Sequence, residues 1–272
     1  MSEEIDDRKT EVRTYFVRGR NALVARAEFS KIYVDYYLHL ADCGLQASPA
    51  EADYAKAALA AITLHGASRP RNERSAWTVN FQEPLLNVFA AVDNPAGTVV
   101  ANVFSENVKE GAQGMFYADT IRGEVAPRRS VVDFDSADFF GAAESYYANS
   151  EQRLTRFFPY GDDEYVLVGA QPDCDLEWLN GLNAEAVREL DRTEELSLLE
   201  QRYYHFECGC TQQRMMRVIL PTFRKNPEMI FEGDEVIRMS CPRCGARHTI
   251  TREALEALEA LEKADSSAET IP

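Results

Sequence analysis

The first two thirds of the chain alternates between strand-like and helix-like spacing of hydrophobic residues. The pattern predicts extended chain over residues 12–27, on either side of a turn at Gly19-Arg20-Asn21. Helical spacing follows from Ile32 to Asp42. Ser48-Pro49-Ala50-Glu51 then forms a capping box with proline at the first helical position. This predicts a second helix that continues to about Gly66.

From residue 76 the spacing becomes that of strands separated by turn residues. The predicted strands are 77–81, 85–92, 98–104, 114–118, 155–160 and 164–169. Ser136 is placed to cap a helix between the fourth and fifth of them. This order of elements predicts an α+β domain with an antiparallel sheet over residues 1–174.

Residues 175–205 have a different character. Val187 and Leu190, and then Leu196, Leu199 and Tyr203, form short apolar stripes at helical spacing. Glycine, asparagine, serine and like charges interrupt these stripes. The segment is therefore predicted to be a helical linker of low intrinsic stability that needs a neighbour to pack on.

The last part of the chain, residues 206–263, is expected to be a small separate module. Its pattern predicts helices at 212–220 and 227–231, a strand ending at Ser240, and a final helix over three Ala-Leu-Glu repeats at 254–262. Residues 264–272 are small and polar and are expected to be a disordered tail.

Four cysteines in this module carry the most specific signal. Cys208 and Cys210 form a Cys-Gly-Cys pair, and Cys241 and Cys244 form a Cys-Pro-Arg-Cys pair after a 30-residue gap. Two close pairs of thiols are the sequence form of a tetrahedral site for one Zn²⁺ ion. Four thiolates leave no open position on the metal, which disfavours catalytic zinc. The close spacing also allows each pair to close on itself as a disulfide.

Composition and charge narrow the possible partners and location. The 272 residues carry a net charge of −16, which argues against nucleic acid as a partner. Of these residues 45% are hydrophobic, which is enough to form a hydrophobic core. The acidic start, Met1 to Asp7, has no apolar region of a secretory signal, and no apolar run reaches the ~18–20 residues needed to cross a bilayer. We therefore expect a cytoplasmic protein that does not bind membranes, in a compartment where thiols stay reduced.

The remaining candidate groups are expected to be ordinary. Cys43 and Cys174 are interpreted as free thiols, and His205 and His248 as packed or exposed side chains rather than metal ligands. Neither a catalytic triad nor a pair of catalytic carboxylates can be assigned, so no enzyme is proposed.

With these motifs in place, the chain resembles the redox-regulated holdase chaperones, the thirty-three-kilodalton heat-shock protein family. Cys208, Cys210, Cys241 and Cys244 match the family's Cys-x-Cys and Cys-x-x-Cys motifs, and the order of parts agrees. Val17-Arg18-Gly19 resembles its opening strand, and the segment 146–152 resembles its Tyr-x-x-Ser-Glu-Gln motif. The family's Gly-Asp-Gly turn is replaced here by Gln82-Glu83-Pro84, and its later Gly-rich strand region is altered around residues 111–114.

The resemblance implies a molecular chaperone that works without ATP. In the reduced state the four cysteines would hold zinc and the protein would be inactive. Oxidants would form Cys208–Cys210 and Cys241–Cys244 disulfides, release zinc and unfold the linker. The active form would bind unfolding client proteins and tend to form a homodimer.

Two other functions fit the residues without the resemblance. One is a constitutive protein-interaction module in which the zinc is purely structural, since most sites with four thiolates are structural. The other, weaker one is a thiol-disulfide oxidoreductase. Its Cys-x-x-Cys motif should open a helix inside a βαβ unit, whereas here Gly245 leads into extended chain.

Overall fold

The structure is a computed structural model that describes residues 8–161 and 163–268. It divides into two compact units, Met1–Cys208 and Gly209–Pro272. The finer division of the chain into a linker and a tail stays a prediction. The acidic start at residues 1–7, which was expected not to be a secretory signal, lies outside the described residues.

The first unit is built around one ten-stranded sheet with the order β7-β6-β3-β4-β5-β10-β1-β2-β9-β8. Its strands are β1 Thr10–Val17, β2 Ala22–Glu28, β3 Glu73–Gln82, β4 Leu85–Asp93, β5 Thr98–Phe104, β6 Gly114–Arg122, β7 Arg128–Phe134, β8 Thr155–Tyr160, β9 Glu164–Ala170 and β10 Leu196–Phe206. Neighbouring strands pair antiparallel, except that β10 pairs parallel with β5. The predicted α+β class is confirmed.

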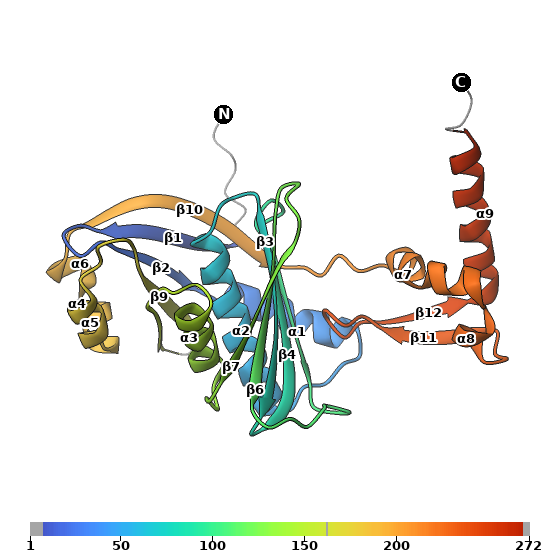
Figure 1. Ribbon diagram of the computed structural model, residues 1–272, viewed down its shortest axis with the longest axis horizontal. Helices are drawn as coiled ribbons and strands as arrows, with labels where there is room; N and C mark the ends of the chain where they lie inside the picture. The colour runs from blue at the N-terminus through green and yellow to red at the C-terminus, as the bar shows by residue number, and fades with distance from the viewer. Residues whose placement is uncertain (1–7, 162, 269–272) are drawn as a thin grey trace. The chain divides into compact units, whose positions relative to one another are not determined.

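Six helices accompany this sheet in the described part of the first unit. They are α1 Ser30–Asp42, α2 Pro49–Ala67, α3 Phe139–Asn149, α4 Leu176–Gly181, α5 Ala184–Arg188 and α6 Leu190–Thr193. Figure 1 shows α2 and α3 between the two halves of the curved sheet. The capping box predicted at Ser48 and Glu51 is present at the start of α2. Small residues let α2 approach β4 closely, because a Cβ added to Gly66 would lie 2.6 Å from Val92 Cγ2.

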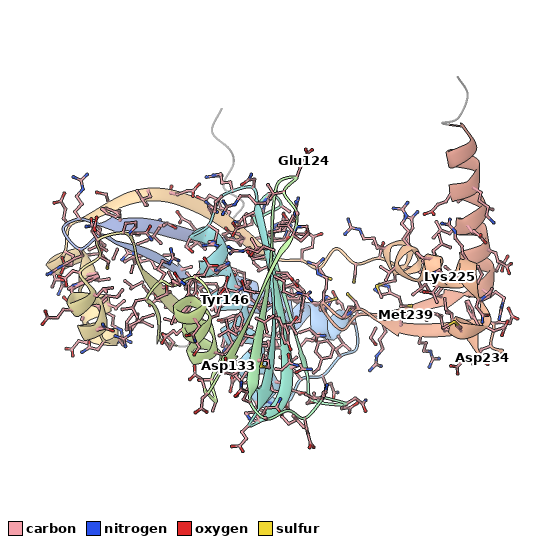
Figure 2. All side chains as sticks on the ribbon, viewed as in Figure 1. Glu124, Asp133, Tyr146, Lys225, Asp234 and Met239 are labelled. Atoms are coloured by element: carbon pink, nitrogen blue, oxygen red, sulfur yellow. The ribbon has the colours of Figure 1, made fainter. Side chains whose placement is uncertain are left out.

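An aromatic cluster fills the space between α2, α3 and the sheet. Trp77 is fully buried, and its ring centroid lies 5.2 Å from that of Phe116. Tyr146 stacks on Phe116 at 5.0 Å, and Figure 2 shows it among the side chains of the first unit. Phe139 is buried in the same core, and Phe140 beside it is partly buried.

The prediction of helix was wrong for the second part of the linker, since residues 196–206 form strand β10. Leu196, Leu199 and Tyr203 have helical spacing, but the side chains buried at the end of the strand are Tyr204 and Phe206, which alternate. The backbone of β10 pairs with β1 from Thr10↔Tyr204 to Val17↔Leu196. These hydrogen bonds to a distant strand, together with a run of aromatic residues, outweigh the local helical pattern.

Only the first part of the predicted linker is helical. Leu179, Leu182, Val187 and Leu190 from α4–α6 pack on a buried group of side chains in β1, β2, β8 and β9. Each of these helices is four to six residues long. Helices this short are not stable alone, so they depend on this packing.

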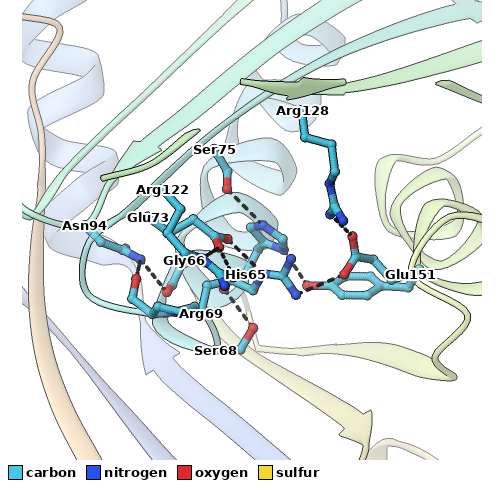
Figure 3. A network of polar contacts seen from close by, with 12 residues as sticks. His65, Gly66, Ser68, Arg69, Glu73, Ser75, Asn94, Arg122, Arg128 and Glu151 are labelled. Carbon is cyan, nitrogen blue, oxygen red and sulfur yellow. Dashed lines mark hydrogen bonds and ion pairs between the residues drawn. The ribbon is translucent and has the colours of Figure 1, made fainter. Parts of the chain in front are cut away.

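A network of arginine and glutamate side chains, with Arg69, Glu73 and Glu151 buried at its centre, connects α2, α3 and the sheet (Figure 3). Arg69 donates hydrogen bonds to Glu73 Oε1 at 2.8 Å and to Glu151 Oε2 at 3.0 Å. Arg122 donates to the other oxygen of Glu73 at 2.7 Å, and Arg128 to the other oxygen of Glu151 at 2.8 Å. Burial by itself would raise the pKa of Glu151, but Arg69 and the hydrogen bonds lower it, so the carboxylate is held ionised.

His65 lies beside this network in the core. Its Nδ1 is 2.6 Å from the hydroxyl of Tyr147, and its Nε2 is 3.2 Å from Ser75 Oγ. Burial lowers the pKa of His65 well below its usual value, and Arg69 and Arg153 lower it further. The imidazole is therefore neutral in the folded protein at neutral pH.

The second unit contains α7 Gln212–Lys225, α8 Glu228–Phe231, β11 Val236–Ser240, β12 Arg247–Thr251 and α9 Arg252–Ala268. The antiparallel hairpin β11–β12 and the three helices surround a small core that includes Phe223 and Phe231, whose ring centroids are 6.0 Å apart. The final helix passes the predicted start of the tail at residue 264, and residues 269–272 lie outside the described part. Among the described residues, no helix is long and apolar enough to cross a bilayer.

Replacing Arg69 with leucine should destabilise the first unit strongly, because Glu73, which has 0% exposure, would lose one of its two cationic partners. Removing one partner from a buried ion pair leaves a buried charge poorly compensated. We expect a loss of about 3 kcal/mol in the free energy of unfolding, measured by urea denaturation.

The exposed pair Arg129–Asp119 provides the matched control. Arg129→Leu should cost less than about 1 kcal/mol, because water already solvates both charges. Similar losses in the two variants would contradict a structural role for the buried network.

The neutral state of His65 predicts how stability depends on pH. Since its folded pKa lies below its unfolded value of ~6.5, the unfolded chain binds more protons as the pH falls. This contribution is fully present above about pH 6.5 and is lost toward lower pH, by at most ~1.4 kcal/mol per pH unit.

His65→Gln cannot bind this proton, so the difference in unfolding free energy between wild type and variant should shrink between pH 7 and pH 5. Urea denaturation at several pH values measures it. A difference that stays constant over this range would show that His65 is protonated equally in both states.

Candidate metal centre

The hairpin β11–β12 positions two of the four cysteines. Ser240 pairs with Arg247 at the end of the hairpin, so Cys241 and Cys244 lie in the connecting turn. Within this turn the amide of Gly245 donates to Cys241 O, and the amide of Cys241 donates to Ala246 O, both at 2.8 Å. Gly245 has a φ of +78°, a conformation that glycine adopts without strain. Both thiols of the turn are 2% exposed.

The other two cysteines lie between the end of β10 and the start of α7. Cys208 follows the last residues of β10, and Cys210 directly precedes Thr211, whose hydroxyl caps α7 by accepting from the amide of Arg214 at 3.2 Å. Gly209 between them has a φ of +63° and reverses the chain.

The structure brings all four predicted cysteines together. Their sulfur atoms lie within 4.8 Å of one another, and the Cys210 and Cys244 sulfurs are 3.5 Å apart. A tetrahedral metal with four sulfur ligands at ~2.3 Å has sulfur–sulfur distances of ~3.8 Å. None of the four is in a disulfide, so the cluster has the donor set and the size to hold a metal ion.

Two further side chains contact this cluster. His248 Nε2 lies 3.3 Å from Cys210 Sγ, close enough to donate a hydrogen bond to a thiolate. The guanidinium of Arg214 donates to the carbonyl of Gly209 and so supports the Cys-Gly-Cys turn. No sequence motif singles out Arg214. Its position three residues after the helix cap is a signal that could have placed it beside the cysteines.

The other residues considered from the sequence lie outside the cluster. His205 Nε2 is 3.0 Å from a carboxylate oxygen of Glu207. Cys43 and Cys174 are both half-buried, and burial is the largest cause of the raised pKa of each thiol. Cys174 packs beside the residues of α4 and their buried neighbours.

The comparison with known proteins points to one family. The model of the family described as Hsp33 protein matches residues 161–251, from strand β9 to strand β12. A protein named 33 kDa chaperonin from Nitrosococcus oceani is 21% identical over 153 residues, which are 48% of this chain and 53% of that protein. A protein of the same name from Caldanaerobacter subterraneus is 34% identical over 65 residues, which are 24% of this chain and 22% of that protein.

The matched region thus spans about half the length of the first of these relatives and less of the second. The fold extends the likeness over nearly the whole chain. The crystal structure of the 33 kDa chaperonin from Thermotoga maritima, a heat shock protein 33 homologue, aligns with a TM-score of 0.69 at 15% identity. The alignment covers 93% of this chain and 99% of that one. The sequence similarity is confined to part of the chain, whereas the fold is shared over nearly all of it, so this chain is similar to proteins of the Hsp33 family in both respects.

Proposed function

We propose that this protein is a redox-regulated holdase chaperone that works without ATP in the cytoplasm. In the reduced state Cys208, Cys210, Cys241 and Cys244 bind one zinc ion and the chaperone is inactive. Oxidation converts the four thiolates to two disulfides, releases the metal, and allows unfolding client proteins to bind, with a homodimer as the active form. The observation that carries the proposal is the convergence of four cysteine thiols in a chain that is similar to the Hsp33 family.

Zinc is the metal that this donor set fits. Four thiolates in a tetrahedral arrangement are typical of a closed structural zinc site, which leaves no position for water or substrate. The core of the second unit is small, and a module of this size gains much of its folding free energy from a bound metal. Loss of the ion is therefore expected to unfold the second unit as well as to free the thiols.

The spacing of the cysteines supports disulfides within each pair. The thiolates of Cys208 and Cys210 would transfer two electrons to a peroxide, which with two protons leaves as two water molecules, and a sulfur–sulfur bond forms. Cys241 and Cys244 would react in the same way. Gly209 between the first pair and Gly245 beside the second have left-handed backbone conformations, so the chain already turns where each bond would form.

Helices α4–α6 are the segment that we propose is released on activation. They are too short to persist without packing, whereas β10 is hydrogen-bonded to strands on both sides. Their departure would uncover the buried side chains of Val17, Val24, Phe158 and Val166. An apolar surface of this kind binds unfolding proteins without sequence specificity.

The zinc site predicts a metal content that depends on the thiols. The reduced protein should bind one zinc ion per chain, measured by mass spectrometry of the metal. Cys241→Ser should lose most of it, because a hydroxyl is a poor zinc ligand. Cys174→Ser, which changes a thiol outside the cluster, should keep it. Retention of one zinc ion by Cys241→Ser would contradict the assigned ligands.

The chaperone activity is tested by light scattering of an aggregating client protein. The protein is added either reduced and loaded with zinc, or treated with peroxide and freed of zinc. We expect only the oxidised form to suppress aggregation. Equal suppression by both forms would indicate a chaperone without redox control, and no suppression by either would leave a protein with a structural metal site and another partner.

A further inference from the structure

The end of helix α1 lies beside the end of strand β10 in the first unit. The ring centroid of His39 is 5.3 Å from that of Phe206, and Tyr36 contacts the same ring at 5.7 Å. Cys43 follows directly after α1, and Cys208 comes two residues after Phe206. The packing of these rings therefore brings Cys43, a thiol outside the four-cysteine cluster, toward Cys208.

The surroundings of Cys43 agree with this placement. Its Sγ lies 3.9 Å from both ring nitrogens of His39, so an imidazole is in contact with the thiol. Burial raises the pKa of Cys43, and the neighbouring Asp42 and Cys208 raise it further.

The backbone on both sides is built to turn at these thiols. Gly44 follows Cys43 with a φ of +60°, and Gly209 follows Cys208 with a φ of +63°. No atom lies within 4 Å of a Cβ added to Gly44, so the chain has room to move there. Glycine at both positions allows each cysteine to reorient without distorting α1 or β10.

We propose that Cys43 is a fifth redox thiol, which exchanges with the Cys208–Cys210 disulfide to form a Cys43–Cys208 disulfide. The inference rests on the proposed function, which supplies the first disulfide through a peroxide. The thiolate of Cys43 attacks Cys208 Sγ, a new sulfur–sulfur bond forms, and Cys210 leaves as a thiolate. The proton lost by Cys43 is balanced by the one that Cys210 takes up, so the exchange needs no second oxidant.

The exchange would change the oxidised state in two ways. It would join α1 covalently to the end of β10, and it would return Cys210 to the reduced form beside His248. The four-cysteine cluster could then be rebuilt only after the Cys43–Cys208 bond is reduced. Cys43 would thus determine how readily the oxidised protein returns to its metal-bound state.

Peptide mapping of the full-length protein tests this directly. The reduced, zinc-loaded protein is treated with hydrogen peroxide, remaining thiols are alkylated, and the protein is digested with trypsin without reduction. Cys43 falls in the peptide 32–56, and Cys208 and Cys210 both fall in the peptide 203–214. We expect a disulfide within a single chain to join these two peptides, with one alkyl group on Cys210.

Two variants accompany the wild type. Cys43→Ser should lose the joined peptides and accumulate the Cys208–Cys210 disulfide, while zinc release is unchanged. Cys174→Ser removes another half-buried thiol with a raised pKa and should behave as wild type. Circular dichroism of the reduced variants checks that each is folded.

The remaining outcomes separate this inference from the function on which it rests. If zinc is released and the Cys208–Cys210 disulfide forms while Cys43 stays fully alkylated, the exchange is overturned and the redox switch stands. If zinc is retained and no disulfide forms in the cluster, both are overturned.

Discussion

The short parallel pairing of β10 with β5 is the contact on which the first unit depends. It consists of His205 opposite Thr98 and Phe206 opposite Val99, and it joins two halves of the sheet that are otherwise antiparallel. The amide of His205 also donates a hydrogen bond to Gly97 O. The two backbones approach closely here, because a Cβ added to Gly97 would lie 2.7 Å from Tyr203 O. Because Cys208 lies two residues after Phe206, the same contact fixes where the four-cysteine cluster begins.

The two units are stabilised by different physical means. The first has a large aromatic core and a buried network of arginine and glutamate side chains, in which each carboxylate has at least two partners. The second has a small core around Phe223 and Phe231, and it contributes Cys210, Cys241 and Cys244 to the four-cysteine cluster. The first unit therefore has sources of stability that do not depend on the proposed metal.

Sequence patterns predicted the parts of the structure that local chemistry determines. The capping box at Ser48 and the cysteine motif each specify their geometry within a few residues, and both were found as expected. Strand β10 was missed because its partner β1 lies far away in the chain, and Leu196, Leu199 and Tyr203 coincide with a helical repeat. The burial of Glu73 could not be predicted either, because the sequence around this strand does not indicate that two arginines lie next to its carboxylate.

The position of β10 between α6 and Cys208 has a mechanical consequence. In an antiparallel pair the hydrogen bonds run perpendicular to the strands. A force on Cys208 along β10 would therefore act in shear on all the hydrogen bonds between β10 and β1 at the same time. The short helices before β10 resist the same tension with side-chain packing alone. Among elements connected in series the weakest yields first, so strain that arises at the thiols would be relieved at α4–α6, with the sheet left intact.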